Sequence, residues 1–364
     1  MSRFAQRRSK LRKLIAKHDA SAMLVTDERN VTYLTGFTGD SSYLLLSARE
    51  AILISDPRYT IQLEEECPDL TLVIRSPVTK IHTAAADVVV SAKISRLAIE
   101  AHSLSMANYQ TIEQDMTGVD CLPTEGIVES LREVKDKDEL DEIRYSVMLA
   151  ERAFAVVRAS LRPEQTEKEI ADDLEHQIRL FGGRGTSFTP IVGVGDRSAL
   201  PHYRPGDLRV DDAGFMLVDW GAQGRRYMSD LTRMIVTGKV PAKLEKIYNI
   251  VLAANRKAIQ TIRPGVMMNA VDRAARKVIE DRGYGKKFSH SLGHGIGLQI
   301  HEGPWLRGNE KQPLKAGMVV TVEPGIYLSG FGGVRIEDDV LVTRDGCEVL
   351  SSVPKQWEDC HALA

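Results

Sequence analysis

The first third of the chain alternates short apolar runs with polar and basic stretches. Phe4, Leu11 and Ile15 mark one face of a first helix. Polar residues and glycine between 30 and 39 predict a loop that enters the next strand. The apolar runs have the length and composition of strands, and they lie at residues 22–26, 43–47, 51–54 and 70–74. Helices that alternate with strands predict an α/β domain over residues 1–130.

The pattern changes at about residue 130. Residues 131–142 are dense in charge and open a long helix. Thr166 and Glu169 have the spacing of a capping box at the start of the next helix. The apolar positions of the long helix recur at helical spacing: Leu140, Ile143, Val147, Ala150 and Phe154. Two more helices are predicted at residues 243–262 and 269–282, with glycine-punctuated strands between and after the helices. We expect a second domain over residues 131–364.

The composition, 43% hydrophobic and 27% charged, is that of a soluble globular protein. A net charge of −2 gives no global field that favours nucleic acid, so no such partner is expected. No run approaches the roughly 18 apolar residues of a membrane span, which predicts no membrane partner and a cytoplasmic location. The cysteines form no CxxC pair, so neither structural zinc nor a disulfide framework is expected: Cys67, Cys121, Cys347 and Cys360.

Two acidic hairpins are predicted in the second domain. In the first, an apolar strand leads to Asp219, and a return strand brings Asp230. A turn centred between Gly224 and Arg225 would set Asp219 opposite Asp230, with their Cβ atoms roughly 4.5–5.5 Å apart on one face. Two like charges so placed repel each other. Either a cation lies between them or one of them is protonated.

The second hairpin has its midpoint at Gly330, which sets Glu323 opposite Glu337. Strand alternation puts Thr321 on the face of Glu323 and Arg335 on the face of Glu337. An acid in the middle of an apolar strand is costly unless it is paired or bound to metal. Two hairpins with opposed carboxylates therefore indicate a metal site.

Four of the nine histidines are candidates for binding or catalysis. His290, His294 and His301 fall within one glycine-rich segment, and His202 lies beside a proline elsewhere. His290 and His294 have the spacing of a zinc-protease helix, but the glutamate of HExxH is absent. Three glycines between 293 and 297 also argue against a helix. We predict a turn or irregular strand, in which the backbone approaches a ligand closely.

In order and spacing, these residues resemble the pita-bread metallopeptidase family, which includes aminopeptidase P, prolidase and methionine aminopeptidase. The matching stretches, between about residues 140 and 350, are LVDWG with SDLTR, HSLGHGIGLQIHEGP, TVEPGIY and RIEDDV. NVTYLTGFTG and SDPRYT resemble the creatinase-type N-terminal domain of the aminopeptidase P and prolidase branch. The resemblance implies a creatinase-like α/β domain followed by an α+β pita-bread catalytic domain.

The resemblance also implies roles for individual residues. His202, His290 and His301 would be substrate-side histidines, and Arg335 would orient a nearby ligand carboxylate. Asp230 would bridge two metal ions together with Glu337. The full ligand set implied by the family is Asp219, Asp230, His294, Glu323 and Glu337.

Such a ligand set suggests a mechanism. Four carboxylates, two divalent ions and a hydroxide leave a charge of about −1, which attracts the free α-ammonium group of a peptide. Oxygen-rich ligation with one imidazole suits Mn²⁺ or Co²⁺, and Zn²⁺ or Fe²⁺ also fit. His301 would polarise the scissile carbonyl, and Glu323 would carry the proton to the leaving nitrogen. His202 and His290 would hold the residues on either side of the bond.

The expected function is a dinuclear Xaa-Pro aminopeptidase that acts on peptides with a free N-terminus. Proline specificity and a homodimeric state rest on the resemblance alone. The main alternative is a Xaa-Pro dipeptidase, or prolidase. A metal-free creatinase-like hydrolase and a non-catalytic binding module of the same fold are further alternatives, and the intact ligand set argues against both.

Overall fold

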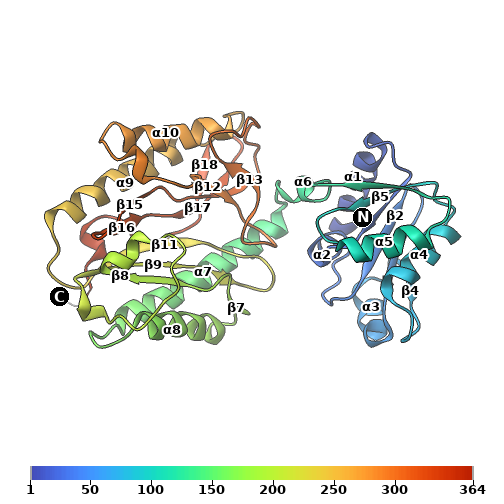
Figure 1. The fold of residues 1–364 in the computed structure, drawn as a ribbon, viewed down its shortest axis with the longest axis horizontal. Helices are drawn as coiled ribbons and strands as arrows, with labels where there is room; N and C mark the ends of the chain where they lie inside the picture. The colour runs from blue at the N-terminus through green and yellow to red at the C-terminus, as the bar shows by residue number, and fades with distance from the viewer. Residues whose placement is uncertain (1, 363–364) are drawn as a thin grey trace. The chain divides into compact units, whose positions relative to one another are not determined.

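The computed structural model describes residues 2–362 and divides into two compact units, Met1–Arg132 and Glu133–Ala364. The two units share no sheet (Figure 1). Each has its own hydrophobic core. The first unit mixes helices with a single sheet, and the second combines long helices with several antiparallel sheets. The predicted fold class is therefore confirmed.

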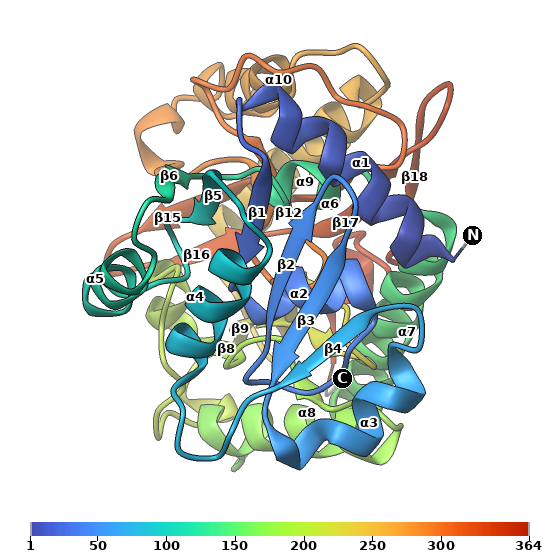
Figure 2. The ribbon, with the colours of Figure 1, turned by 90° about the vertical axis from the view of Figure 1, so that its right-hand side faces the viewer.

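Residues 2–132 build a six-stranded mixed sheet in the order β4-β3-β2-β1-β5-β6, in which Figure 2 shows β2, β3 and β4 side by side. β2 pairs antiparallel with β1 and β3, whereas the other neighbours are parallel. The strands are β1 (Ala22–Val25), β2 (Tyr43–Ser47), β3 (Ala51–Ser55), β4 (Thr71–Ile74), β5 (Arg96–Glu100) and β6 (Asp120–Thr124). The helices are α1 (Arg3–Lys17), α2 (Glu28–Thr35), η1 (Pro57–Tyr59), α3 (Thr60–Glu66), α4 (Ile81–Ser91), α5 (Met106–Asp115) and α6 (Glu129–Arg132). All four predicted strands are present.

The loop predicted at residues 30–39 is wrong in its first half, which belongs to α2. The Asp27 side chain caps this helix by accepting the N–H groups of Arg29 and Asn30. The helix ends at Gly36, whose φ of 85° is left-handed. The segment is mostly polar in sequence, but three of its residues form an apolar helix face: Val31, Tyr33 and Leu34.

Residues 133–362 contain four α-helices and four sheets. The helices are α7 (Lys137–Ala159), α8 (Glu167–Leu180), α9 (Ala242–Thr261) and α10 (Met268–Glu280), with short 3-10 helices η2 (Gly195–Ala199), η3 (Val210–Asp212), η4 (Gly285–Lys287) and η5 (Glu358–Cys360). A three-stranded sheet is ordered β11-β9-β8, and a five-stranded sheet β13-β12-β14-β17-β18. Two further pairs are β10-β7 and β15-β16.

The strands of this unit are β7 (Gly185–Thr186), β8 (Ile191–Val194), β9 (Phe215–Trp220), β10 (Ala222–Gln223), β11 (Leu231–Val236), β12 (Gly293–Gly295), β13 (Glu302–Leu306), β14 (Val319–Val322), β15 (Gly325–Leu328), β16 (Gly332–Arg335), β17 (Asp338–Val342) and β18 (Cys347–Val349).

The long helices of the second unit follow the predicted patterns. α7 begins after Asp136, which forms a capping box with Glu139. The predicted capping box of Thr166 and Glu169 is present at the start of α8. α9 and α10 bury their apolar faces in one large core together with β14 and β17. The predicted apolar positions of α7 include four that are buried: Ile143, Val147, Ala150 and Phe154.

The register predicted for the first acidic hairpin is wrong. Asp219 on β9 lies opposite Thr232 on β11, whereas Asp230 directly precedes β11. The segment between β9 and β11 is longer than a simple turn. Part of it forms β10, which pairs with β7. Gly221 allows this path, since a Cβ there would lie 1.9 Å from the carbonyl oxygen of Ser229. Strand alternation still directs Asp230 to the face of Thr232, next to Asp219.

The register predicted for the second hairpin is confirmed. Gly325 on β15 pairs with Arg335 on β16, which centres the hairpin on Gly330. β14 and β17 continue the same register in the neighbouring sheet. Glu323 and Glu337 occupy matching positions at the break between the two ladders. Neither glutamate is paired within either ladder, and both lie where the hairpin passes from one sheet to the other.

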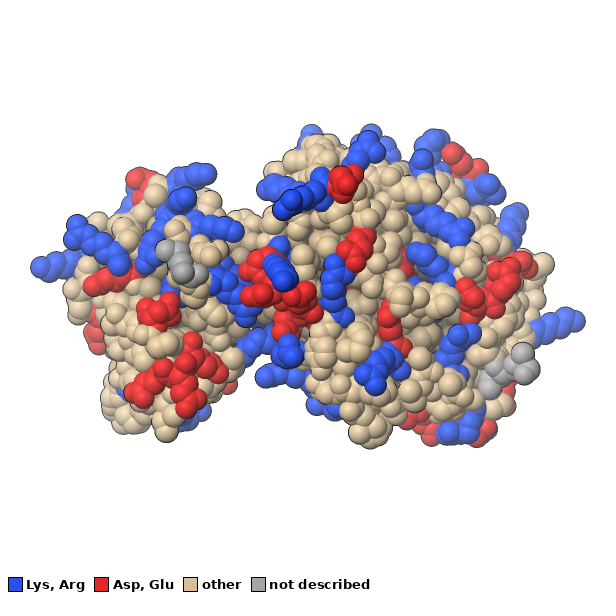
Figure 3. Space-filling model, turned by 180° about the vertical axis from the view of Figure 1, so that it is seen from behind, with Lys and Arg blue, Asp and Glu red and all other residues tan. Residues whose placement is uncertain are grey.

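Charged side chains of both signs are interspersed on the face of each unit seen in Figure 3. The four cysteines are free, and two of them, Cys67 and Cys360, are buried. Within residues 2–362, none of the helices combines the length and apolar character that a membrane crossing requires.

Candidate metal centre

The five predicted ligands lie on or beside strands of the second unit. Asp219 is on β9, and Asp230 directly precedes β11. His294 is on β12, a short strand with a register shift after His294, as expected for the glycine-rich segment. Glu323 follows β14, and Glu337 precedes β17. All except Glu323 are buried, and the Glu323 side chain is 16% exposed.

Three of these side chains come close enough to share one ion. Asp230, His294 and Glu337 each offer one ligand atom within 4.8 Å of the other two. Nε2 of His294 lies 3.7 Å from Oδ2 of Asp230 and 3.4 Å from Oε1 of Glu323. Glu323 therefore adjoins the trio through His294.

Asp219 stands beside this group and is paired with Arg335. Nη2 of Arg335 donates to Oδ2 of Asp219, and Nε donates to the Thr232 hydroxyl at 3.0 Å. That hydroxyl in turn donates to Oε2 of Glu337 at 2.6 Å. Oδ1 of Asp219 is buried and has no hydrogen-bond partner among residues 2–362. Arg335 thus contacts Asp219 directly and reaches Glu337 through Thr232. It leaves Oδ1 of Asp219 available to a ligand.

Burial and mutual repulsion raise the pKa values of the acids. Desolvation is the largest cause for Asp230, followed by the negative charges of Glu337 and Asp219. The pKa of Glu337 is raised by burial and then by Glu323 and Asp219. Burial raises the pKa of Glu323 to about 8, although Arg335 acts against this rise. Without a cation, such a group of carboxyls retains protons at pH values where exposed acids are ionised.

His294 presents a neutral ring nitrogen to these acids. Its Nδ1 lies 3.1 Å from the carbonyl oxygen of Gly295, which can only accept, so the proton is on Nδ1. Burial and then the neighbouring His301 lower the pKa of His294 to about 3. The lone pair of Nε2 therefore faces the carboxyl oxygens of Asp230 and Glu323, which is the arrangement of a metal ligand.

His290 belongs to a chain of hydrogen bonds that starts at Arg335. Nδ1 of His290 donates to the carbonyl oxygen of Ser291 at 2.8 Å, so Nε2 accepts the Tyr327 hydroxyl at 2.9 Å. The Tyr327 oxygen accepts Nη1 of Arg335 at 2.9 Å. Burial, followed by the charge of Arg335, lowers the pKa of His290 to about 4. Both ring nitrogens of His290 are thus engaged within the protein.

His301 and His202 lie on the exposed side of the same site. The ring of His301 packs edge-on against His294, with centroids 4.4 Å apart. Burial and then His202 lower the pKa of His301. Burial raises the pKa of Asp219, while Arg335 and then His202 act against that rise. His202 is therefore within electrostatic range of the acids and of His301, although it comes from a loop distant in sequence.

The residues present fit divalent metal ions. The donors are carboxylate oxygens and one neutral imidazole, and Oδ1 of Asp219 accepts no hydrogen bond from the part of the chain that the structure describes. Acids that raise each other's pKa by repulsion gain most from a cation placed among them. Oxygen-rich donors with a single nitrogen are typical of Mn²⁺, Co²⁺, Fe²⁺ and Zn²⁺ sites in enzymes.

Sequence reasoning missed several polar residues that surround the acids. Asp338 and Asp339 are buried directly after Glu337. Oδ2 of Asp339 accepts the backbone N–H of Asp230 at 3.1 Å. Thr232 lies between two predicted ligands, as described above. The signal was present in the RIEDDV stretch, where two further acids interrupt an apolar strand.

Comparison with known proteins places both units. Residues 141–344 match the model of metallopeptidase family M24, and residues 7–134 match the creatinase/prolidase N-terminal domain.

Three solved structures resemble the whole chain. A Xaa-Pro dipeptidase from Bacillus anthracis is 36% identical with a TM-score of 0.94, and the match covers 97% of this chain and 99% of that one. An X-Pro aminopeptidase from Thermotoga maritima MSB8 is 34% identical with a TM-score of 0.87 and coverages of 94% and 99%. A prolidase from Pyrococcus horikoshii OT3 is 30% identical with a TM-score of 0.90 and coverages of 96% and 99%.

Proposed function

Because the chain belongs to metallopeptidase family M24, we propose that it is a Xaa-Pro dipeptidase, which cleaves the bond between an N-terminal residue and a following proline. The chain is a metallo-exopeptidase, as its family and its solved relatives indicate. The observation that carries the catalytic proposal is the buried trio of Asp230, His294 and Glu337, whose ligand atoms converge within 4.8 Å.

The choice of a dipeptidase departs from the sequence-based ranking, which put the aminopeptidase first. The solved structure with the TM-score of 0.94 is that of a Xaa-Pro dipeptidase, and a second neighbour, at 0.90, is a prolidase. An aminopeptidase remains the second candidate, because an X-Pro aminopeptidase is 34% identical over nearly the whole chain. These likenesses support the alternative named from the sequence better than the first choice.

We further propose that two divalent ions bind here, with Mn²⁺ as the preferred metal. Asp230 and Glu337 would contribute to both ions, and Asp219, Glu323 and His294 would complete the donors. The chemistry that such ions supply is Lewis-acid polarisation and a water-derived nucleophile at neutral pH. The free Oδ1 of Asp219 and the proton-free Nε2 of His294 support this assignment.

Glu323 is proposed as the proton carrier of the reaction. Its side chain, 16% exposed, is the most accessible of the five proposed ligands, so a water molecule and a peptide could both reach its carboxylate. Its Oε1 accepts the Thr321 hydroxyl at 3.2 Å, which limits its rotation. From this position Glu323 would take a proton from the attacking water and pass it to the departing proline nitrogen.

The histidines are proposed to hold the peptide. His301 is exposed beside His294, and it would donate a hydrogen bond to the scissile carbonyl oxygen. His202 and His290 would contact the residues on either side of the bond. His290 makes such a contact only by exchanging its bond with Tyr327, because its other nitrogen is held by Ser291. Arg335 would keep Asp219 oriented.

The remaining proposals concern the setting of the enzyme. The substrate would be a peptide with a free N-terminus, without a nucleic-acid or membrane partner. We propose a homodimer in the cytoplasm, with residues 1–130 and 131–364 as its creatinase-like and catalytic domains. The family of the chain supports the peptide substrate, whereas the homodimer and the location stay predictions.

One assay separates the two candidate functions. The Mn²⁺-loaded protein would be given Ala-Pro and Ala-Pro-Pro at equal concentrations, and proline release would be followed. A dipeptidase has a much higher kcat/KM for Ala-Pro, and a preference for Ala-Pro-Pro would establish the aminopeptidase instead. Activity on neither peptide would contradict both candidate functions. Activity that resists EDTA would also contradict both, and it would favour a metal-free hydrolase.

A further inference from the structure

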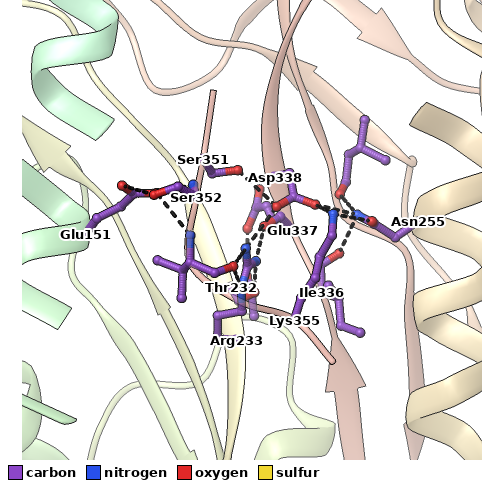
Figure 4. Close-up of polar contacts among 12 residues, drawn as sticks. Glu151, Thr232, Arg233, Asn255, Ile336, Glu337, Asp338, Ser351, Ser352 and Lys355 are labelled. Carbon is purple, nitrogen blue, oxygen red and sulfur yellow. Dashed lines mark hydrogen bonds and ion pairs between the residues drawn. The ribbon is translucent and has the colours of Figure 1, made fainter. Parts of the chain in front are cut away.

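A buried network of polar contacts centred on Asp338 lies directly beside Glu337 (Figure 4). The Asp338 side chain is almost fully buried. Its oxygens accept hydrogen bonds from three separate segments, through Arg233 Nη2 at 2.9 Å, Ser351 Oγ at 2.9 Å, Asn255 Nδ2 at 3.1 Å and Lys355 Nζ.

Arg233 connects this network to the candidate ligand. Its Nη1 donates to the carbonyl oxygens of both Thr232 and Glu337, and its Nη2 donates to Asp338. The backbone N–H of Glu337 donates to the Thr232 carbonyl at 3.2 Å, and the Thr232 hydroxyl donates to Oε2 of Glu337. The main chain and the carboxylate of Glu337 are therefore both fixed against β11.

The other side of the network is formed by residues 351–355, which we call the C-terminal clamp. The clamp contributes the Ser351 hydroxyl, the Val353 carbonyl, which accepts Arg233 Nη2 at 2.7 Å, and the Lys355 ammonium. The Lys355 ammonium also donates to Oδ1 of Asn255 at 2.9 Å. Glu151 on α7 also contacts the clamp (Figure 4). Its carboxylate accepts hydrogen bonds from the Ser352 hydroxyl and from the backbone N–H of Val353.

We propose that the C-terminal clamp positions Glu337 for metal binding, with Lys355 as its key positioning residue. Lys355 holds Asp338, Asp338 holds Arg233, and Arg233 holds the backbone that carries Glu337. None of the clamp residues belongs to the predicted ligand set, and all of them follow the last ligand in the chain. The proposal rests on the proposed function, because it requires that Glu337 bind a metal ion.

The test is a Mn²⁺ titration of metal-free, full-length protein by calorimetry, with Lys355→Met as the variant. Loss of a residue that orients a ligand typically weakens metal affinity by about 10–100-fold, and we expect the lower end of that range. The rise in Tm that Mn²⁺ produces would shrink accordingly. Lys355→Arg, which keeps a donor for Asp338, would restore most of the affinity.

Arg144→Met provides a matched control. Arg144 pairs with Glu348 on β18 through two hydrogen bonds, but both side chains are more than a third exposed, and neither touches Asp338. This variant also removes one cation that contacts the C-terminal part of the chain. It is expected to bind Mn²⁺ as the wild type does.

The outcomes separate the two proposals. If the wild type binds Mn²⁺ and Lys355→Met binds it equally well, the clamp is wrong and the metal site stands. If the wild type binds no divalent ion, the proposed function fails and the clamp fails with it. Should Lys355→Met not fold, Ser351→Ala removes one donor to Asp338 and is expected to weaken Mn²⁺ binding less. Unchanged affinity in that variant would overturn the clamp.

Discussion

Two buried acidic sites, one in each unit, show how a structural acid differs from a proposed metal ligand. In the first unit, Glu100 at the end of β5 accepts the backbone N–H groups of Thr26 and Asp27 at 2.6 and 2.7 Å. It also accepts the Asn30 amide at 2.7 Å. The protein thus supplies the donors that this carboxylate requires, and no cation is needed to explain its burial.

The acids of the second unit have the opposite surroundings. Asp219, Glu323 and Glu337 each raise the pKa of a neighbouring acid by repulsion. Burial also raises the pKa of Glu100, to about 7, but backbone donors oppose that rise. The difference lies in what surrounds each carboxyl group: N–H donors in the first unit, and other acids in the second. Buried acids that face one another are typical of a metal-binding site.

The largest expected effect comes from Asp230→Ala. It removes a carboxylate from the trio that converges within 4.8 Å. Losing the metal centre should remove about 4 kcal/mol or more of transition-state stabilisation, a fall in kcat/KM of about 10³-fold. Elemental analysis and Ala-Pro turnover would be measured together. A variant that keeps full metal content and activity would show that the trio is not the metal site.

A smaller effect is expected for Glu323→Gln, which keeps a donor oxygen but cannot carry a proton. We expect kcat to fall by about 10²–10⁴-fold, as for loss of a general acid–base group. Metal content checked in the same sample must remain close to that of the wild type for this interpretation. Wild-type kcat at full occupancy would eliminate the proton-carrier role.

The pH dependence of stability would sharpen the comparison further. The pKa of Glu323 rises from 4.5 to about 8 on folding, so the folded, metal-free protein binds more protons than the unfolded chain between these values. The free energy of unfolding should therefore fall as pH rises through this window. Mn²⁺ replaces those protons, so its stabilising effect should grow with pH in urea titrations. Metal-free stability that increases from pH 5 to pH 8 would contradict the assignment.

The smallest effect on catalysis is expected for Glu100→Gln. An amide in this place cannot accept all three N–H donors, so the free energy of unfolding should fall by about 1–3 kcal/mol. Turnover of Ala-Pro by the folded variant should match that of the wild type. A large loss of turnover without loss of stability would mean that the acid of the first unit also serves the reaction.

Sequence patterns predicted the second hairpin correctly because its register depends on one short turn at Gly330. The same reasoning failed for Asp219 and Asp230, because β10 leaves their connection to pair with β7, a partner distant in sequence. Alternation by two residues nevertheless kept both acids on one face. Local counting therefore recovers which side chains meet, even where it misplaces them along the strand.

The surroundings of the candidate ligands could not be predicted in the same way. Arg233, Asp338 and Lys355 come from β11, β17 and the C-terminal clamp, and only the folded chain brings them together. Residues 30–39 show a related limit. Their polar letters predicted a loop, whereas the Asp27 cap and a buried apolar face make half of them helical. Contacts between distant segments decide both cases.

The unbroken register on both sides of Glu323 and Glu337 has a consequence for engineering. Because β14–β17 and β15–β16 share one alignment, the meeting of these two glutamates depends on how many residues separate them and little on which ones they are. The tip of the hairpin around Gly330 should accept exchanges such as asparagine, which tolerates a φ of 71°. Adding or removing a single residue there would instead slide one glutamate past the other and turn its side chain to the opposite face.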